Sequence, residues 1–474
     1  MKASVAAAAR ASATIVQKHW VSSVLCLLLF TSVLQAATVF SITAGHGFLI
    51  GIAPYWFVGG FTLFAVLIHL PSSTRSMTAI LPRDALLAIV FLAAFSAYAI
   101  ASAFTLPRIF EGIKVLNPRL GIDLQYMSPS TLHWSFSNAG QAGYTLINFS
   151  VFIFLVLRLS GDKELAFICR LLIGIGLCVM GFALFQHISV LYFPNSVYKA
   201  LYTISHNNPV YTSYPLTTTR TNSFFLEPSF FSGVAAAFAV LGMNVYLYTG
   251  RKLPLLLALG GGYAVLTSVA ATGYLAFLAG ALETVAFVVI RLLRTRASPP
   301  DLQAARRFPV VLVLLFGIGL LFWQEQTRSD QAELVRQQTL GKQNTVSFRN
   351  RLWADQFSLS TVSRETDLLG AGLGSNRPSS FLAYVVSNLG LPGLISFLGF
   401  VLLLARACLR EMARLSPGAL AVCAAFFTYL AAMFGALPDA NWPPLMWILA
   451  AITIAGLARS TPAVQQAPNP ARHA

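Results

Sequence analysis

The chain has 474 residues, of which 56% are hydrophobic and only 10% are charged. Its mean hydropathy of +0.70 excludes an ordinary soluble domain, because even a large soluble core leaves a mostly polar exterior. The formal net charge of +16 is typical of a membrane protein whose basic residues face the cytoplasm and anionic lipid, and we expect no nucleic-acid partner.

Apolar windows long enough to cross a bilayer as a helix recur along the whole chain. We therefore expect an all-α integral membrane protein with about twelve transmembrane helices, a single polytopic domain over residues 1–474. The predicted windows are 20–43, 48–70, 84–106, 138–159, 165–189, 229–249, 253–268, 272–293, 308–324, 389–408, 418–437 and 443–458. The first window could be a signal peptide, but its apolar character continues to about Thr43, which favours a retained helix.

Basic residues favour the cytoplasmic side of a membrane. If both termini are cytoplasmic, most of the 32 lysines and arginines lie inside and most of the 16 acidic residues lie outside. Three extracytoplasmic loops are then long, at 107–137, 190–228 and 325–388. Long loops usually carry function, so we expect the chemistry on the extracytoplasmic face.

The sequence shows no metal or disulfide pattern. The five cysteines all fall in or beside predicted spans, and the histidines are scattered singly without metal-ligand spacing. We therefore expect no metal, no cofactor and no disulfide.

The most informative stretch is 220–231, RTNSFFLEPSFF, where a polar loop turns into an apolar span. Arg220 and Glu227 form a charge pair at this membrane boundary, and charges at such places usually serve chemistry. Glu227 also has a structural interpretation, because an acidic residue before Pro228 can cap the free N–H groups of a helix. For Arg220 the alternative is a lipid headgroup contact. His206, in the polar SHNNP stretch, is the one histidine that we consider a candidate.

The first two loops each allow two interpretations. The first contains Arg119 among apolar residues and is either an interfacial segment that covers the bundle or part of a ligand site. The second is rich in Tyr, Thr and Asn, a composition that suits sugar rings and hydroxyls. Aromatic residues also gather at membrane interfaces without a ligand.

The third loop contains two predicted helices. Residues 328–340 are typical of a surface helix, and residues 347–359 are amphipathic, with Phe348, Leu352 and Leu359 roughly on one face. A glycine string then leads back to the membrane at NLGLP.

Two arginines of the predicted helix at 347–359 have different explanations. Arg349 and Arg351 would point about 200° apart on a helix, so we expect at most one of them to reach a given ligand. Arg351 has Asp355 at i+4, the ordinary helical ion pair, which leaves Arg349 as the functional candidate. The glycine string GAGLGS at 370–375 lacks the strand and helix of a nucleotide-binding motif, and we interpret it as a tight turn.

Three stretches together resemble the bacterial O-antigen polymerase and O-antigen ligase superfamily. They are RTNSFFLEPSFF, the SVAATG turn at 268–273 between two short spans, and the run from Ser347 through Arg349 and Trp353 into GAGLGSNRPSSF and NLGLPG. The ligases carry an arginine where this chain has Ala270 and Ala271, and a histidine in the large loop, which here has none. The resemblance therefore favours the polymerase branch, with the ligase as an alternative.

The resemblance implies a metal-independent glycosyltransferase on the periplasmic face of the bacterial inner membrane. It would join polyprenyl-diphosphate-linked repeat units into an exopolysaccharide, a capsule or an O-antigen. Arginines would bind the diphosphate, and a nearby base would accept the proton of the acceptor hydroxyl. The candidate catalytic residues are Arg220, Glu227, Arg349 and His206, and the candidate substrate-binding residues are Arg119, Asn222, Arg351, Trp353 and Arg377.

Expected partners are the lipid-linked glycan, membrane lipid, and a chain-length regulator, a flippase or export proteins. A transporter of glycans or lipids is another alternative, but it should place charges near the bilayer midplane. Here Glu283 is the one clearly intramembrane acid. A non-catalytic scaffold of an export complex also stays open.

Overall fold

The computed structural model describes residues 22–44, 48–116, 129–159, 162–191, 196–206, 220–296, 298–327, 341, 343, 345–436 and 442–459. Within this part of the chain, eight helices are long and apolar enough to cross a membrane. They are α3 (Arg83–Ile109), α4 (Phe136–Arg158), α5 (Asp162–Leu191), α7 (Pro228–Thr249), α9 (Ala271–Arg294), α10 (Pro299–Thr327), α14 (Phe381–Glu411) and α15 (Pro417–Ala436). The expected all-α membrane architecture is therefore confirmed, with eight of the predicted spans shown as spanning-length helices.

The other predicted windows contain shorter helices. These are Ser22–Ser32, the apolar first part of α2 (Pro54–Ile80), α8 (Lys252–Ser268) and α16 (Pro444–Arg459). The pieces at α8 and α16 coincide closely with the two shortest predicted windows. Their bounds follow from Arg251 before α8 and from Pro444 at the start of α16, a residue suited to a first helical turn.

The expectation of a continuous helix to Thr43 is wrong. The first helix ends at Ser32, and β1 (Phe40–Ala44) then pairs with β2 (Phe48–Ile52) as an antiparallel hairpin. Both strands consist largely of aromatic, β-branched and aliphatic residues. Periodicity alone does not distinguish a short apolar strand from a helical segment, so the sequence window ran through the hairpin.

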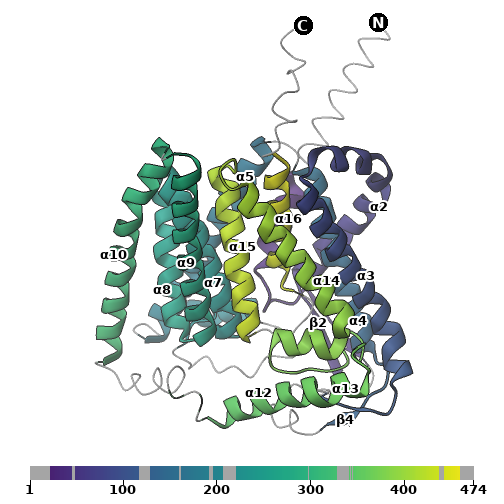
Figure 1. Ribbon diagram of the computed structural model, residues 1–474. Helices are drawn as coiled ribbons and strands as arrows, with labels where there is room; N and C mark the ends of the chain where they lie inside the picture. Colours follow the sequence, from purple (N-terminus) through teal and green to yellow (C-terminus); the bar gives the residue numbers. More distant parts are fainter. Residues whose placement is uncertain are drawn as a thin grey trace, which may run out of the picture.

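Helix α7 lies at the centre of one half of the bundle, among α8, α9, α10 and α15 (Figure 1). Nearly every residue from Pro228 to Tyr248 is buried, and an apolar helix without a polar face is expected in such a place. Gly242 permits the close approach of α8, because a Cβ there would lie 2.5 Å from the carbonyl oxygen of Pro254. Helix α10 is the opposite case, since its apolar side chains are mostly exposed, as on a lipid-facing helix.

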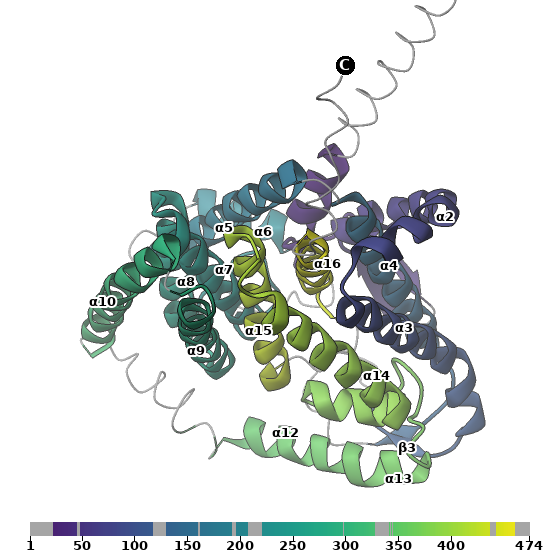
Figure 2. The ribbon, with the colours of Figure 1, turned by 45° about the horizontal axis from the view of Figure 1, so that its top comes forward.

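One end of the bundle carries the short elements between the long helices. Here α12 (Val346–Phe357) lies across the ends of the long helices, next to the π-helix η5 (Ser358–Val362) and α13 (Ser363–Glu365) (Figure 1, Figure 2). The same end holds the strand pair β3 (Lys114–Val115) and β4 (Ser130–Thr131). The starts of α7, α9 and α14 also face this end, which therefore contains the described parts of all three long predicted loops.

The first and third predicted loops form one structural unit. Leu116 donates its N–H to Asn376 Oδ1 at 2.8 Å, and Arg377 donates its N–H to the Leu116 carbonyl at 2.7 Å. Beside them lies a small apolar cluster, separate from the main core, of Val115, Leu132, Val362 and Ala371. This cluster attaches the region of α12 to the end of α3.

The predicted helix at 347–359 is observed as α12 and the first part of η5, but its packing face differs from the expected one. Leu352 and Leu359 are nearly half exposed, whereas Ala354 and Ser358 are buried. Ala354 and Ser358 face the protein, because small side chains allow close packing there. Leu352 and Leu359 face outwards. The predicted helix at 328–340 lies outside the described residues.

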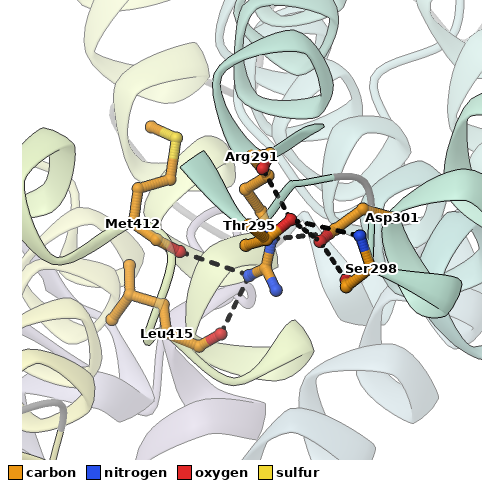
Figure 3. A network of polar contacts seen from close by, with 6 residues as sticks. All are labelled: Arg291, Thr295, Ser298, Asp301, Met412 and Leu415. Atoms are coloured by element: carbon orange, nitrogen blue, oxygen red, sulfur yellow. Dashed lines mark hydrogen bonds and ion pairs between the residues drawn. The ribbon is translucent and has the colours of Figure 1, made fainter. Parts of the chain in front are cut away.

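A buried polar network fixes the opposite end of the bundle (Figure 3). Arg291 Nε lies 2.8 Å from Asp301 Oδ1, and its Nη1 donates to the carbonyls of Met412 at 3.2 Å and Leu415 at 3.0 Å. The second oxygen of Asp301 accepts from Thr295 Oγ1 at 2.7 Å. A buried ion pair is tolerated only when its remaining donors and acceptors are satisfied, and this one joins the turn between α9 and α10 to the turn after α14.

Candidate functional site

The segment that begins at Arg220 pairs with the turn between α8 and α9. Arg220 Nε donates to the Ser268 carbonyl at 3.0 Å, and the Thr221 N–H donates to the Thr267 carbonyl at 3.1 Å. The hydroxyls of Thr221 and Thr267 are 2.8 Å apart. Two stretches that the sequence analysis considered separately, RTNS and SVAATG, thus lie side by side.

The turn between α8 and α9 has an unusual backbone. Val269 has a φ of +46°, a left-handed conformation that is rare for a β-branched residue, and its N–H donates to the Leu266 carbonyl at 3.1 Å. Ala270 then stands at the N-cap of α9 and has no side chain to accept from the first turn. Backbone strain often occurs at functional sites, and the first N–H groups of a helix without a cap form its positive end.

Glu227 occupies the N-cap position of α7, and Pro228 begins the helix, as the sequence indicates. Its carboxylate does not make the expected cap, because no N–H of the first turn donates to it. Instead, Glu227 Oε2 accepts from the hydroxyl of Ser229 at 3.0 Å. The half-buried carboxylate therefore lies beside the start of α7, and the helix start itself has no side-chain cap.

Gln186 of α5 organises the segment after Arg220, and the sequence analysis did not identify it. Its Oε1 accepts the N–H groups of Asn222 at 3.1 Å and Ser223 at 2.9 Å, and its Nε2 donates to Asn222 Oδ1 at 2.7 Å. Ser223 has a φ of +49°, so the carboxamide supports a strained backbone. A buried glutamine inside an apolar span is a signal that could have identified it, because polar residues within the membrane usually have a specific role.

Asn222 connects this backbone to His206. Its Nδ2 donates to the Phe225 carbonyl at 2.8 Å and lies 3.2 Å from His206 Nε2. The imidazole stacks on Tyr202 of α6 (Ser196–Ser205), with ring centroids 3.8 Å apart. Burial lowers the pKa of His206 to about 4, so the ring is neutral at pH 7 and can accept a proton.

The candidate arginines of the third loop lie on α12, where their side chains are exposed. The expected ion pair between Arg351 and Asp355 is not formed, so this prediction is wrong. Asp355 Oδ1 instead accepts the N–H groups of Ser379 at 2.7 Å and Ser380 at 3.0 Å, just before α14. Two backbone donors satisfy the carboxylate better than one exposed arginine, since a surface ion pair contributes little. Arg349 is an exposed cation at this end of the bundle, and we retain it as a candidate.

The remaining predicted binding residues fall in different places. Trp353 stacks on Phe357 of the same helix, with ring centroids 5.4 Å apart, so one face of its indole is used in packing. The half-buried Arg377 is joined through its N–H to Leu116. Arg119 lies outside the described residues. Thus Arg220, Asn222 and His206 belong to one connected region, and Arg349, Arg351 and Trp353 belong to another element at the same end.

The glycine string 370–375 is a tight turn whose donors are already used. The N–H groups of Ala371 and Gly372 donate to carbonyls of α14, at 2.8 and 2.9 Å. Those of Ser375 and Asn376 both donate to Asn388 Oδ1, at 3.1 and 2.9 Å. A phosphate cradle needs N–H groups that are free to bind the anion. This arrangement agrees with the interpretation as a turn.

Within the described part of the chain, no three His, Cys, Asp or Glu side chains lie close enough together to hold a metal ion. No protein-family model matches the chain, and no curated protein matches it. The resemblance to the O-antigen polymerase and ligase superfamily therefore stays a prediction from the motifs.

Proposed function

We propose that the protein is a metal-independent glycosyltransferase that polymerises polyprenyl-diphosphate-linked repeat units at the periplasmic face of a bacterial inner membrane. The observation that carries the proposal is the contact between Arg220 and the carbonyl of Ser268, the last residue of α8, at the turn that leads into α9. A guanidinium and two helix starts without side-chain caps, those of α7 and α9, together favour an anion. A diphosphate is the anion that this reaction releases.

In the proposed reaction, an acceptor hydroxyl of one repeat unit attacks the anomeric carbon of another. The bond between that carbon and the diphosphate oxygen breaks, and the leaving diphosphate takes the electron pair. Arg220 stabilises the developing negative charge through fixed donors, a role that arginine performs while fully protonated. The proton of the hydroxyl passes to Glu227 or to the neutral His206, and the contact of His206 with Asn222 supports an orienting role for Asn222.

The topology of the proposal follows from the charge distribution. With both termini in the cytoplasm, the end of the bundle that carries Arg220 and α12 is periplasmic. Arg349 on α12 is then a second cation for the phosphate groups. A chain-length regulator, a flippase and export proteins are the expected partners.

The test uses purified protein and a synthetic polyprenyl-diphosphate repeat unit without nucleotide sugar. We expect a ladder of longer glycans from the wild type. Arg220→Ala should lower the rate by about 10² to 10³, the usual loss when one electrostatic donor is removed. Arg220→Lys should restore little, because lysine lacks the planar pair of donors.

Arg364→Ala is the matched control, because Arg364 is an exposed arginine of α13 at the same end of the bundle. It should leave the ladder unchanged. A full ladder from Arg220→Ala would contradict the role of this arginine. A folded wild type that makes no ladder from a competent substrate would contradict the polymerase itself, and transfer to other acceptors would be tested next.

A further inference from the structure

Three arginines gather at the last turns of α9 and α14, at the end of the bundle opposite Arg220. Arg406 Nε lies 3.3 Å and Arg410 Nη1 lies 3.9 Å from the same oxygen, Oδ2 of Asp84 at the start of α3. Arg294, at the end of α9, donates through Nη1 to the carbonyl of Leu409. We call Arg294, Arg406 and Arg410 the arginine cluster.

The three positive charges of the arginine cluster are only partly neutralised by the carboxylates around it. Asp84 is the carboxylate in contact with it, and the side chain of Asp84 is only 11% exposed. The side chains of Arg406 and Arg410 are 71% and 68% exposed. Two guanidinium groups that reach one carboxylate oxygen are also close enough together to reach one phosphate, with donors to spare.

The neighbouring Arg291 shows what a structural arginine looks like in this protein. It is almost fully buried, and its donors go to Asp301, Met412 and Leu415 (Figure 3). The other nearby acid, Glu411, pairs with Arg414 at 3.1 Å rather than with the cluster. The acid that contacts the arginine cluster is therefore the buried Asp84, whose single negative charge faces two of the three arginines.

Apolar stripes lead along both helices to the cluster. On α14 the stripe consists of exposed residues at helical spacing, namely Leu391, Ile395, Leu398 and Leu402, and Arg406 follows at the next turn. On α9 the corresponding residues are Leu275, Leu278, Leu282, Val285, Val289 and Leu293, followed by Arg294. Helix α15 lies between the two helices in both views (Figure 1, Figure 2). An apolar stripe that ends in cations matches a lipid with acyl chains and an anionic headgroup.

We propose that the arginine cluster binds the phosphate of an anionic glycerophospholipid whose acyl chains lie along the exposed stripes of α9 and α14. The charge complementarity decides the class of lipid, because a zwitterionic headgroup would bring its own cation next to three arginines. The 24 residues of α9 separate the cluster from Ala270 by about 36 Å at 1.5 Å per residue. The lipid site is therefore independent of the proposed polymerase site and can be tested without any glycan substrate.

The test measures thermal unfolding of the purified, delipidated protein in a neutral detergent. We expect phosphatidylglycerol to raise the midpoint temperature, and phosphatidylcholine with the same acyl chains to leave it nearly unchanged. The double variant Arg406→Gln/Arg410→Gln should lose this shift, and Arg364→Gln at the other end of the molecule should keep it. An equal shift with both lipids, or an undiminished shift in the double variant, would overturn the proposal.

A second variant covers the case in which the double variant does not fold. Asp84→Asn removes the competing carboxylate and leaves all three arginines, so it should show a larger shift with phosphatidylglycerol than the wild type. Native mass spectrometry of the same samples should show bound phosphatidylglycerol on the wild type and on Asp84→Asn. No bound lipid, or a smaller shift in Asp84→Asn, would also overturn the proposal.

Discussion

Two segments at the same end of the bundle, 220–227 and 370–377, look alike in sequence, since each is a polar stretch before an apolar helix. They differ in the helix starts that lie beside them. In 370–377 the N–H groups of Ala371, Gly372, Ser375 and Asn376 all go to α14. Around 220–227, the starts of α7 and α9 have no side-chain cap. Within 220–227 itself, the N–H groups of Thr221, Asn222 and Ser223 also have acceptors. The segment 370–377 is thus a structural joint to α14, whereas 220–227 lies beside two uncapped helix starts whose first N–H groups suit an anion.

The largest effect should come from Gly390 of α14, which lies against the joint at 370–377. Gly390 has a φ of +60°, and a Cβ there would lie 2.0 Å from the Leu368 carbonyl oxygen. We expect Gly390→Ala to destabilise the protein by about 3 kcal/mol or more, from backbone strain and overlap together. Thermal unfolding in detergent measures the loss.

Gly317→Ala is the control for this change, because a Cβ at Gly317 of α10 meets nothing within 4 Å. It should be neutral or stabilise the helix by up to about 1 kcal/mol. Equal midpoint temperatures for the two variants would refute the role of Gly390 in the joint.

A pair of asparagine variants sharpens the comparison. Asn388 accepts the N–H groups of Ser375 and Asn376, and Asn222 holds the other segment through Phe225. Each change to alanine leaves buried groups unpaired and should cost about 1–3 kcal/mol of stability. In glycan-ladder assays below the unfolding temperature, Asn388→Ala should keep its activity and Asn222→Ala should lose it. Similar activities in the two variants would show that 220–227 is no more important for glycan elongation than 370–377.

A somewhat smaller effect is expected at Gln186. Gln186→Leu leaves the N–H groups of Asn222 and Ser223 without their acceptor, so the position of Arg220 should become less well defined. We expect the rate of glycan elongation to fall by about tenfold, equivalent to about 1.4 kcal/mol. Leu184→Ala, at an exposed position of the same helix, should leave the rate unchanged. If the two variants are equally active, Gln186 has only a packing role.

The last effect concerns pH and should appear only in acid. The pKa of His206 is about 4 in the folded protein because burial disfavours the charged ring, against about 6.5 in an unfolded chain. The unfolded state therefore binds more protons between these values, and stability should fall as the pH drops from about 6.5 towards 4. His206→Gln should show a weaker dependence over this window, and His133→Gln, at a position outside this network, should retain the wild-type dependence. An unchanged slope in His206→Gln would show that burial of this ring is not responsible.

The places where the sequence analysis failed share a cause. The helix to Thr43 became a hairpin because a local window does not show that β2 is available as a partner. The ion pair between Arg351 and Asp355 was replaced because the backbone of Ser379 and Ser380 lies closer to the carboxylate. Each competing partner comes from a part of the chain that spacing rules do not connect.

The sequence by itself determined the class of the protein, the positions of its long apolar helices, the helix at 347–359 and the place of Glu227 before α7. These are local properties, since hydropathy and helix-start signals act within a few turns. Only the tertiary structure decided that Thr221 pairs with Thr267, that Gln186 supports Asn222, and that the donors of 370–377 are used by α14. Those contacts depend on how the helices pack, because burial forces each polar group to find whichever partner the packing brings near.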